Sequence, residues 1–287
     1  MIITSATVKL LREKTGAGMM DCKKALEASG GDMEKAVEYL RKKGAATAEK
    51  RADRLANQGI VVTRVSQDGA QGIIVEVNCE TDFVARSEDF VAFVNAVAEI
   101  IEKKLPKDIP ALLTLEYSSG KTVADALSEL VGKIGEKIEI KRFEIFKAYG
   151  SVIQSYTHMG SKIGVLVELA TSSPQQEHKT LARDIAMQVA AMNPIVVARE
   201  HVAKDVVEKE LEIYRQQAKN EGKSDQVLDR IANGRLEKFY QEAVLLEQSF
   251  IKDAGKTIKD VLSEINSKLH GETTVRRFKR YQLGDPQ

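Results

Sequence analysis

The sequence predicts an α+β protein: an N-terminal three-helix bundle, a linker, and a duplicated α/β core with an antiparallel helical hairpin inserted in its second half. Three observations predict this class. Apolar residues recur at helical spacing through the first 44 residues. Two later stretches repeat one series of glycine-led strands, capped helices and aromatic pairs. The second stretch is interrupted by a long, charged and amphipathic insertion.

Composition is that of an ordinary soluble globular protein. The chain has 287 residues, with 43 basic and 42 acidic side chains and a net charge of +1. A general nucleic-acid binder normally carries a basic excess, so we expect no direct nucleic-acid contact. No apolar run approaches the roughly 20 residues of a membrane helix, and no leader pattern opens the chain. Two cysteines, Cys22 and Cys79, make no disulfide framework, so we expect a cytoplasmic protein.

The first helix is predicted from an apolar face near the N-terminus. Val8, Leu10 and Leu11 are assigned to that face, with Ser5 or Thr7 as the capping residue. The break at Gly16-Ala17-Gly18 then ends this helix.

Two further helices complete the bundle. Met19 begins the second helix, and Gly30-Gly31-Asp32 ends it and caps the third. The residues expected to face inward are Cys22, Ala25 and Leu26, then Met33, Ala36, Val37 and Leu40. Of Met19 and Met20, one is expected in the core and the other at the surface, because adjacent residues on a helix point in different directions. Residues 45–57 are alanine-rich and charged, which fits either a helical linker or a solvated tether.

The core is predicted from an internal repeat. The motif Gly120-Lys121-Thr122-Val123 recurs as Gly255-Lys256-Thr257-Ile258, and the strand 72–77 recurs as 164–169. An aromatic pair follows each motif at the same separation: Phe143 and Phe146, then Phe278 and Tyr281. Each copy therefore reads as a hairpin, two helices and a strand. Since one such unit would expose a sheet face, two are expected to pack together or to carry helices over their sheets.

The repeated Gly-Lys-Thr motif imitates the end of a phosphate-binding P-loop. Such a loop needs a glycine five residues before the last one, where this chain has Leu115 and Phe250. The threonines of the two motifs are each followed three residues later by an acid, Asp125 or Asp260. We therefore interpret them as helix caps of the Ser/Thr-x-x-acid kind.

The insertion is located by comparing the two copies. Gly72 and Gly120 lie 48 residues apart, whereas Gly164 and Gly255 lie 91 apart, so the second copy carries 43 more. Two amphipathic stretches separated by Gly222 predict an antiparallel coiled-coil hairpin. The predicted parts are 1–44 for the bundle, 45–57 for the linker, 58–149 for the first core unit, 150–204 and 251–287 for the second, and 205–250 for the hairpin.

The stretch from Asn78 to Val84 is the candidate functional segment. It leaves an apolar strand and enters a helix, so it is held at both ends. Two interpretations fit Asp82 and Phe83. Phe83 caps the chain's own core while Asp82 starts the helix, or the acid and the ring are presented to the crevice of another protein.

Two motifs are similar to those of the bacterial elongation factor Ts family. One runs from Thr15 to Leu26, and the other is Thr81-Asp82-Phe83-Val84 after a glycine-led strand. They stand in the order found in the family, and the resemblance continues to about Tyr281. It implies guanine nucleotide exchange on the translational GTPase elongation factor Tu, with no cofactor, metal or catalytic residue. In the family, the loop matching Thr81 to Val84 enters between helices of the GTPase domain and disturbs its Mg²⁺ site.

The resemblance also implies further contacts. The bundle, similar to a ubiquitin-associated domain, would contact the GTPase domain at positions matching Arg12, Met19 and Met20. His158, near the tip of the second-unit hairpin, would face the third domain of the partner. A homodimer or a complex of two factors with two GTPases is compatible with the family. Many members continue beyond the strand matching Val275 to Tyr281 into a further helical segment, so that contact is not expected here.

Two rival functions use other features. A ubiquitin-associated adaptor would bind proteins through the bundle alone and would leave the duplicated core without a role. An enzyme would use Cys79 as a nucleophile, although no local signature supports it and a lone cysteine at a strand end is usually a small core residue.

Overall fold

The N-terminal bundle consists of three helices. The structure, a computed structural model, describes residues 3–158, 160–171 and 174–285. The helices are α1 (Ser5–Thr15), α2 (Met19–Ala28) and α3 (Met33–Lys50). Their shared core holds the predicted inward-facing residues, with Leu11, Cys22 and Leu26 fully buried. The predicted mixture of helix and sheet, with a three-helix segment first, is confirmed.

Three details of the bundle differ from the sequence prediction. Leu10 is exposed, because α1 buries only Val8 and Leu11. The capping residue of α1 is Thr4, and Thr7 instead completes the capping box three residues later. Helix α3 runs through Gly44 to Lys50, so the first part of the predicted linker is helical and the boundary predicted at residue 44 falls inside a helix.

The first core unit is a three-stranded sheet covered on one face by helices. Its elements are β1 (Gln58–Val65), β2 (Gln71–Cys79), α4 (Asp82–Ala85), α5 (Glu88–Lys104), α6 (Ile109–Leu113), β3 (Glu116–Ser118), β4 (Lys121–Thr122), α7 (Val123–Ile134) and β5 (Ile138–Lys147). The strand order is β1-β2-β5, antiparallel throughout. The outer face of β2 packs against α5 through Phe90, Phe93 and Val94.

The second core unit repeats this topology. Its elements are β6 (Ser151–His158), β7 (Ile163–Thr171), α8 (Gln176–Met192), β8 (Ser249–Phe250), β9 (Asp253–Thr257), α11 (Ile258–Leu269) and β10 (Thr273–Gln282). The strand order β10-β7-β6 is the same arrangement with β7 at the centre. Thr122 and Thr257 each form the predicted capping box, with Asp125 and Asp260.

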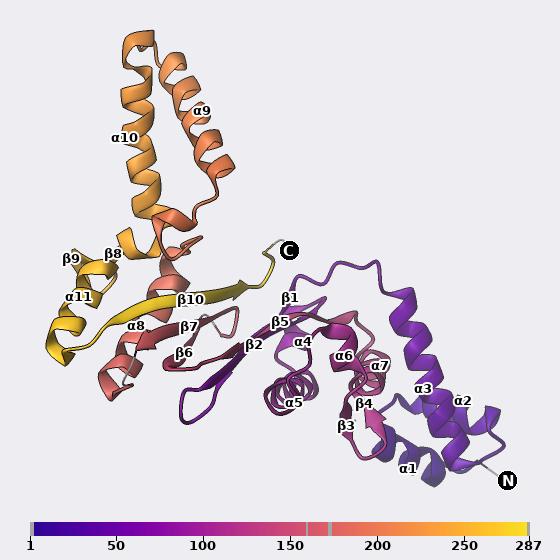
Figure 1. Ribbon diagram of the computed structural model, residues 1–287. Helices are drawn as coiled ribbons and strands as arrows, with labels where there is room; N and C mark the ends of the chain where they lie inside the picture. The colour runs from indigo at the N-terminus through magenta and orange to yellow at the C-terminus, as the bar shows by residue number, and fades with distance from the viewer. Residues whose placement is uncertain (1–2, 159, 172–173, 286–287) are drawn as a thin grey trace.

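The two sheets pack face to face, and each carries its helices on the outer side (Figure 1). A small core lies between the sheets and contains Val61, Ile74, Phe146, Ile153, Leu166 and Tyr281. Gly72 and Gly164 hold equivalent places in this contact. A Cβ atom at Gly72 would lie 2.7 Å from Cγ2 of Ile153, and one at Gly164 would lie 2.6 Å from Cγ1 of Val61. Glycine is therefore required at both positions for the sheets to approach closely.

Buried charges repeat with the same symmetry. Glu76 and Glu168 are fully buried, and each accepts a hydrogen bond of 2.7 Å from the Nε of an arginine on the neighbouring strand, Arg142 or Arg277. The arginines reach across the sheet contact in both directions. Arg142 lies over the Tyr281 ring at 4.2 Å, and Arg277 lies over the Phe146 ring at 4.0 Å. The duplication thus extends from topology to individual ion pairs.

A helical arm projects from the second unit, away from the bundle (Figure 1). It consists of α9 (Lys204–Asn220) and α10 (Asp225–Ala243), between the short 3₁₀ helices η1 (Arg199–His201) and η2 (Leu245–Glu247). Residues 245–250, predicted from sequence to be part of the arm, instead pack into the second core unit. Leu245 and Phe250 belong to the core of the second unit. At the arm base, Arg199 pairs with Glu237 and Glu247.

Candidate partner-binding site

The candidate segment forms a tight turn between β2 and α5. Thr81 caps the four-residue helix α4, its side chain accepting a hydrogen bond from the N–H of Val84. Ser87 then caps α5. Phe83 lies on α4 with 84% of its surface exposed. The interpretation that Phe83 caps the chain's own core is therefore wrong, whereas the expected exposure of the ring is confirmed.

Glu136 braces the turn from the segment that follows α7. Its two carboxylate oxygens accept hydrogen bonds from the backbone N–H of Thr81 at 3.0 Å and from the Thr81 hydroxyl at 2.7 Å. Glu136 binds Thr81, and Thr81 in turn caps α4. The backbone that carries Phe83 is therefore fixed where the short helix begins. Sequence reasoning missed Glu136, and its only local signal is an acid directly after the left-handed glycine Gly135 that ends α7.

Glu80, the residue before the turn, connects three segments. Its carboxylate accepts a hydrogen bond of 2.6 Å from the backbone N–H of Lys137, which lowers the pKa of Glu80. Arg54 and Arg51, just beyond the end of α3, pair with the same carboxylate at 3.2 Å and 3.6 Å. The end of α3, the loop after α7 and the Phe83 turn are thus held together at one point.

The other residues of the segment have different surroundings. Asp82 pairs with Arg86 at 2.8 Å on the surface, an arrangement that contributes little stability. Val84 is half-buried and packs against the core of the first unit. Cys79 is fully buried, and burial raises the pKa of its thiol to about 12. The thiol is therefore protonated at neutral pH, which argues against its proposed use as a nucleophile.

The bundle presents its own exposed side chains. Met19 is 43% exposed and Met20 is 63% exposed, so the prediction that one of them is a core residue is wrong. Gly18 precedes α2 as its cap, and both methionines occupy the first turn of the helix, before its inward face begins at Cys22. Arg12 is exposed near the end of α1. Flexible methionine side chains at a surface suit contact with a partner.

His158 lies at the end of β6, where the hairpin turns. Its Nδ1 lies 2.7 Å from the hydroxyl of Tyr156, and the two rings stack with their centroids 5.7 Å apart. The residue is exposed. The adjacent turn residues Gly160 and Lys162 line a cavity of about 300 Å³ together with Asp82. The hairpin of the second unit therefore lies close to the candidate turn of the first.

Other kinds of site were sought in the part of the chain that the structure describes. Its histidines, cysteines and carboxylates form no group of three or more placed to hold a metal ion. Among the helices of the same residues, none has the length and apolarity needed to cross a bilayer.

An exposed aromatic ring on a braced turn is typical of proteins that act by contacting another protein. The model of the family described as elongation factor TS matches residues 80–285 of the chain. The chain belongs to the elongation factor Ts family, whose members are translation elongation factors.

Relatives named elongation factor Ts match nearly the whole chain. The protein of Prosthecochloris aestuarii is 51% identical over 285 residues, covering 98% of this chain and 99% of its own length. That of Chloroherpeton thalassium is 49% identical over 286 residues, covering 99% of each chain. That of Chlorobium limicola is 51% identical over 286 residues, again covering 99% of each. The similarity includes both the bundle and the duplicated core, so it does not favour an adaptor that uses the bundle alone.

The two hydrogen bonds that Glu136 accepts from Thr81 predict the effect of a substitution at Glu136. The Glu136→Gln variant keeps one acceptor oxygen but loses the charge that strengthens both hydrogen bonds to Thr81. We expect a loss of about 1–2 kcal/mol of folding free energy and faster hydrogen exchange at residues 82–85, because the turn opens more often. Hydrogen–deuterium exchange with mass spectrometry measures this. The Glu144→Gln variant removes a half-exposed carboxylate that lies 3.6 Å from Lys279, and should leave the turn unchanged. Equal exchange in both variants would show that Glu136 does not hold the turn.

Proposed function

We propose that this chain binds the GTPase elongation factor Tu with GDP and promotes release of the nucleotide, so that GTP can bind. Phe83 is the observation that carries this proposal: a large aromatic ring in solvent, on a short helix fixed by Thr81 and Glu136. A soluble chain has no stability reason to expose such a ring on a rigid turn. Family membership supplies the partner.

The proposed mechanism is mechanical. A GTPase holds Mg²⁺ and the nucleotide phosphates with oxygen ligands and backbone donors at closely defined distances. An aromatic wedge that shifts a supporting helix by about one ångström weakens that coordination, because Mg²⁺ demands near-ideal octahedral geometry. In this proposal, Phe83 is the wedge and Asp82 accompanies it, while Thr81 and Val84 fix the backbone. This chain contributes no catalytic residue and no cofactor.

The remaining predicted contacts fit the same proposal. Arg12, Met19 and Met20 would bind the GTPase domain, and His158 would face the third domain of the partner. We also propose that the protein acts in the cytoplasm, where translation takes place. The mass of the isolated complex distinguishes a complex of one factor and one GTPase from one with two copies of each.

Complex formation tests the proposal. Binding of the factor and binding of GDP oppose each other, and the coupling free energy must be the same in both directions. We therefore expect a stable complex with nucleotide-free elongation factor Tu that dissociates when GDP is added in excess, as measured by analytical size exclusion. Absence of any complex, or a complex that GDP does not weaken, would contradict exchange activity.

The arm makes a separate prediction. The wedge lies in the first unit and the arm in the second, so the arm should be dispensable for GDP release. We expect the variant in which a short Gly/Ser turn replaces residues 205–239 to fold and to unfold in one cooperative transition. The entropic cost of closing a loop depends only weakly on the length of the loop. Tyr240, over which Arg199 lies at 4.1 Å, is retained. GDP release at saturating factor should stay within about threefold of the full chain. An unfolded second unit, or a folded but inactive variant, would show that the arm is essential.

A further inference from the structure

Helix α3 of the bundle crosses helix α7 of the first core unit at two glycines. A Cβ atom at Gly44 would lie 2.6 Å from the carbonyl oxygen of Ser128, and one at Gly132 would lie 3.1 Å from the Cα of Gly44. Both glycines stand inside helices, where glycine costs about 1 kcal/mol relative to alanine. Neither has a positive φ that would require glycine. The close approach of the two backbones explains both residues.

The internal repeat provides a natural control for this crossing. Helix α11 of the second unit has the same twelve-residue length as α7 and the same Thr-x-x-Asp cap. It carries Ser267 where α7 has Gly132, and the close backbone approach of α3 at this position is made to α7. A helix of this length and capping therefore does not itself require glycine at this position. The contact with α3 of the bundle requires it.

Charged side chains hold the crossing on either side. Nε of Arg41 lies 2.9 Å from a carboxylate oxygen of Asp125, and this contact is the main cause that lowers the pKa of Asp125 to about 2. Lys133 passes its aliphatic stem 3.0 Å from the place of a Cβ on Gly16, and its Nζ binds Asp89 on α5 at 2.7 Å. Lys133 thereby connects the loop before Met19 to the helix that follows the Phe83 turn.

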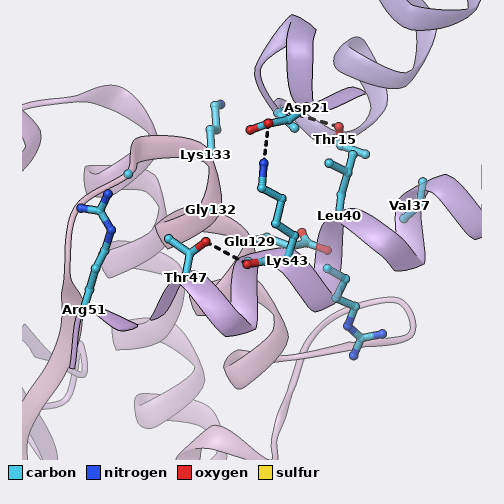
Figure 2. A pocket seen from close by; sticks show the side chains of 14 residues that line it. Thr15, Asp21, Val37, Leu40, Lys43, Thr47, Arg51, Glu129, Gly132 and Lys133 are labelled. Carbon is cyan, nitrogen blue, oxygen red and sulfur yellow. Dashed lines mark hydrogen bonds and ion pairs between the residues drawn. The ribbon is translucent and has the colours of Figure 1, made fainter. Parts of the chain in front are cut away.

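A cavity of about 260 Å³ lies beside the crossing, between the bundle and the core (Figure 2). Figure 2 shows Lys43 of α3 paired with Asp21 of α2 on its bundle side, and Gly132 and Lys133 on its core side. Beside this space, α3 is held to the core by the glycine crossing, by the ion pair of Arg41 with Asp125, and by the pairs that Arg51 and Arg54 just beyond its end form with Glu80.

We propose that the Gly44–Gly132 crossing is a positioning device, which holds the bundle at a fixed place relative to the Phe83 turn. It presents Arg12, Met19 and Met20 to the same partner that Phe83 enters. Helix α3 continues past the crossing to Lys50, and Arg51 and Arg54 just beyond its end bind Glu80 beside the turn. One helix thus connects the two contact regions. This inference rests on the proposed function for its role in exchange, but its geometry is independent of that function.

The positioning device predicts that the bundle is not freely tethered. Two spin labels report this directly, one at Ala28→Cys on α2 and one at Lys104→Cys on α5. Both positions are exposed, whereas the native Cys22 and Cys79 are buried and protected from labelling. Pulsed electron paramagnetic resonance on the full chain should give one narrow distance distribution. A broad distribution in the unsubstituted protein would overturn the proposal.

The Gly44→Ala variant tests the crossing itself. A methyl group at this position must push α3 off the Ser128 carbonyl, so we expect a broadened or shifted distance distribution. The matched control is Gly234→Ala on α10, where a Cβ would meet nothing within 4 Å and alanine should only favour the helix. If Gly44→Ala does not fold, Gly132→Ser introduces the residue that α11 already carries. An unchanged distribution in the folded variant would overturn the crossing as the cause.

Binding of elongation factor Tu then tests the role of the crossing. Loss of a fixed bundle lowers the effective concentration of its contacts, so the variant should need about tenfold more factor for half-maximal GDP release. The maximal rate should be kept, because Phe83 is untouched. A broadened distribution with unchanged half-maximal concentration would overturn the role in partner binding. Failure of the unsubstituted chain to release GDP would instead reject the proposed function, and the distance measurement would still decide the geometry.

Discussion

The Phe83→Ala variant should retain its fold and lose most of its exchange activity. Since 84% of the ring is exposed, truncation removes almost no buried surface, and the free energy of unfolding should change by less than about 1 kcal/mol. In the proposed complex the same ring would fill a crevice of the partner. Central aromatic residues of interfaces typically contribute about 2–4 kcal/mol, so GDP release at limiting factor should slow by about 30-fold or more.

Phe90 provides the matched control for Phe83. It lies in the first turn of the next helix and is fully buried. Phe90→Ala should therefore cost about 3–5 kcal/mol of stability by leaving a cavity in the first unit. Chemical denaturation and stopped-flow release of a fluorescent GDP analogue measure the two effects separately. A Phe83→Ala protein as active as the unsubstituted chain, or as unstable as Phe90→Ala, would refute the proposed wedge.

The Gly164→Val variant should show the largest loss of stability on the sheet contact. A Cβ there would lie 2.6 Å from Val61, 3.1 Å from Thr63 and 3.3 Å from Ile74, all on strands of the other unit. Valine adds two further methyl groups, and paired strands cannot move independently. Overpacking of this kind costs about 1–3 kcal/mol, and we expect the upper end of that range. The sheets should separate enough to weaken the reciprocal stacking of Arg142 and Arg277.

Gly255→Val serves as the control for this substitution. Gly255 lies on β9 at the surface, where a Cβ would meet only a carboxylate oxygen of Asp253 at 3.3 Å. Valine is favourable in strands, so its stability should stay within about 0.5 kcal/mol. Urea denaturation compares both variants with the unsubstituted chain. Equal stability of all three proteins would show that the sheets do not need glycine at their contact.

The duplicated core could be predicted from sequence because its signals repeat at fixed spacing. The Gly-Lys-Thr motif, the aromatic pairs and the strand 72–77 each occur twice. The structure gives both copies the same strand order and the same capping boxes. The arm could be located from the extra residues of the second copy, although the last residues assigned to it belong to the core of the second unit.

The features that sequence reasoning missed depend on contacts between distant segments. Gly44 resembles a helix end, and only the crossing with α7 explains why the helix continues through it. Glu136 lies 55 positions from the threonine it holds. Met19 and Met20 have apolar side chains of the kind found in protein cores, yet both precede the inward face of α2. Apolar periodicity identifies elements but does not report which surfaces meet.

Release of a fluorescent GDP analogue from elongation factor Tu tests the central claim most directly. Excess unlabelled GDP is added to the labelled complex at millimolar Mg²⁺, and the release rate is followed as the concentration of the chain rises. We predict a saturable increase in rate that is much smaller after EDTA has removed Mg²⁺, because the proposed action of the factor is on the Mg²⁺ site. A release rate that does not depend on the concentration of the chain would contradict the account.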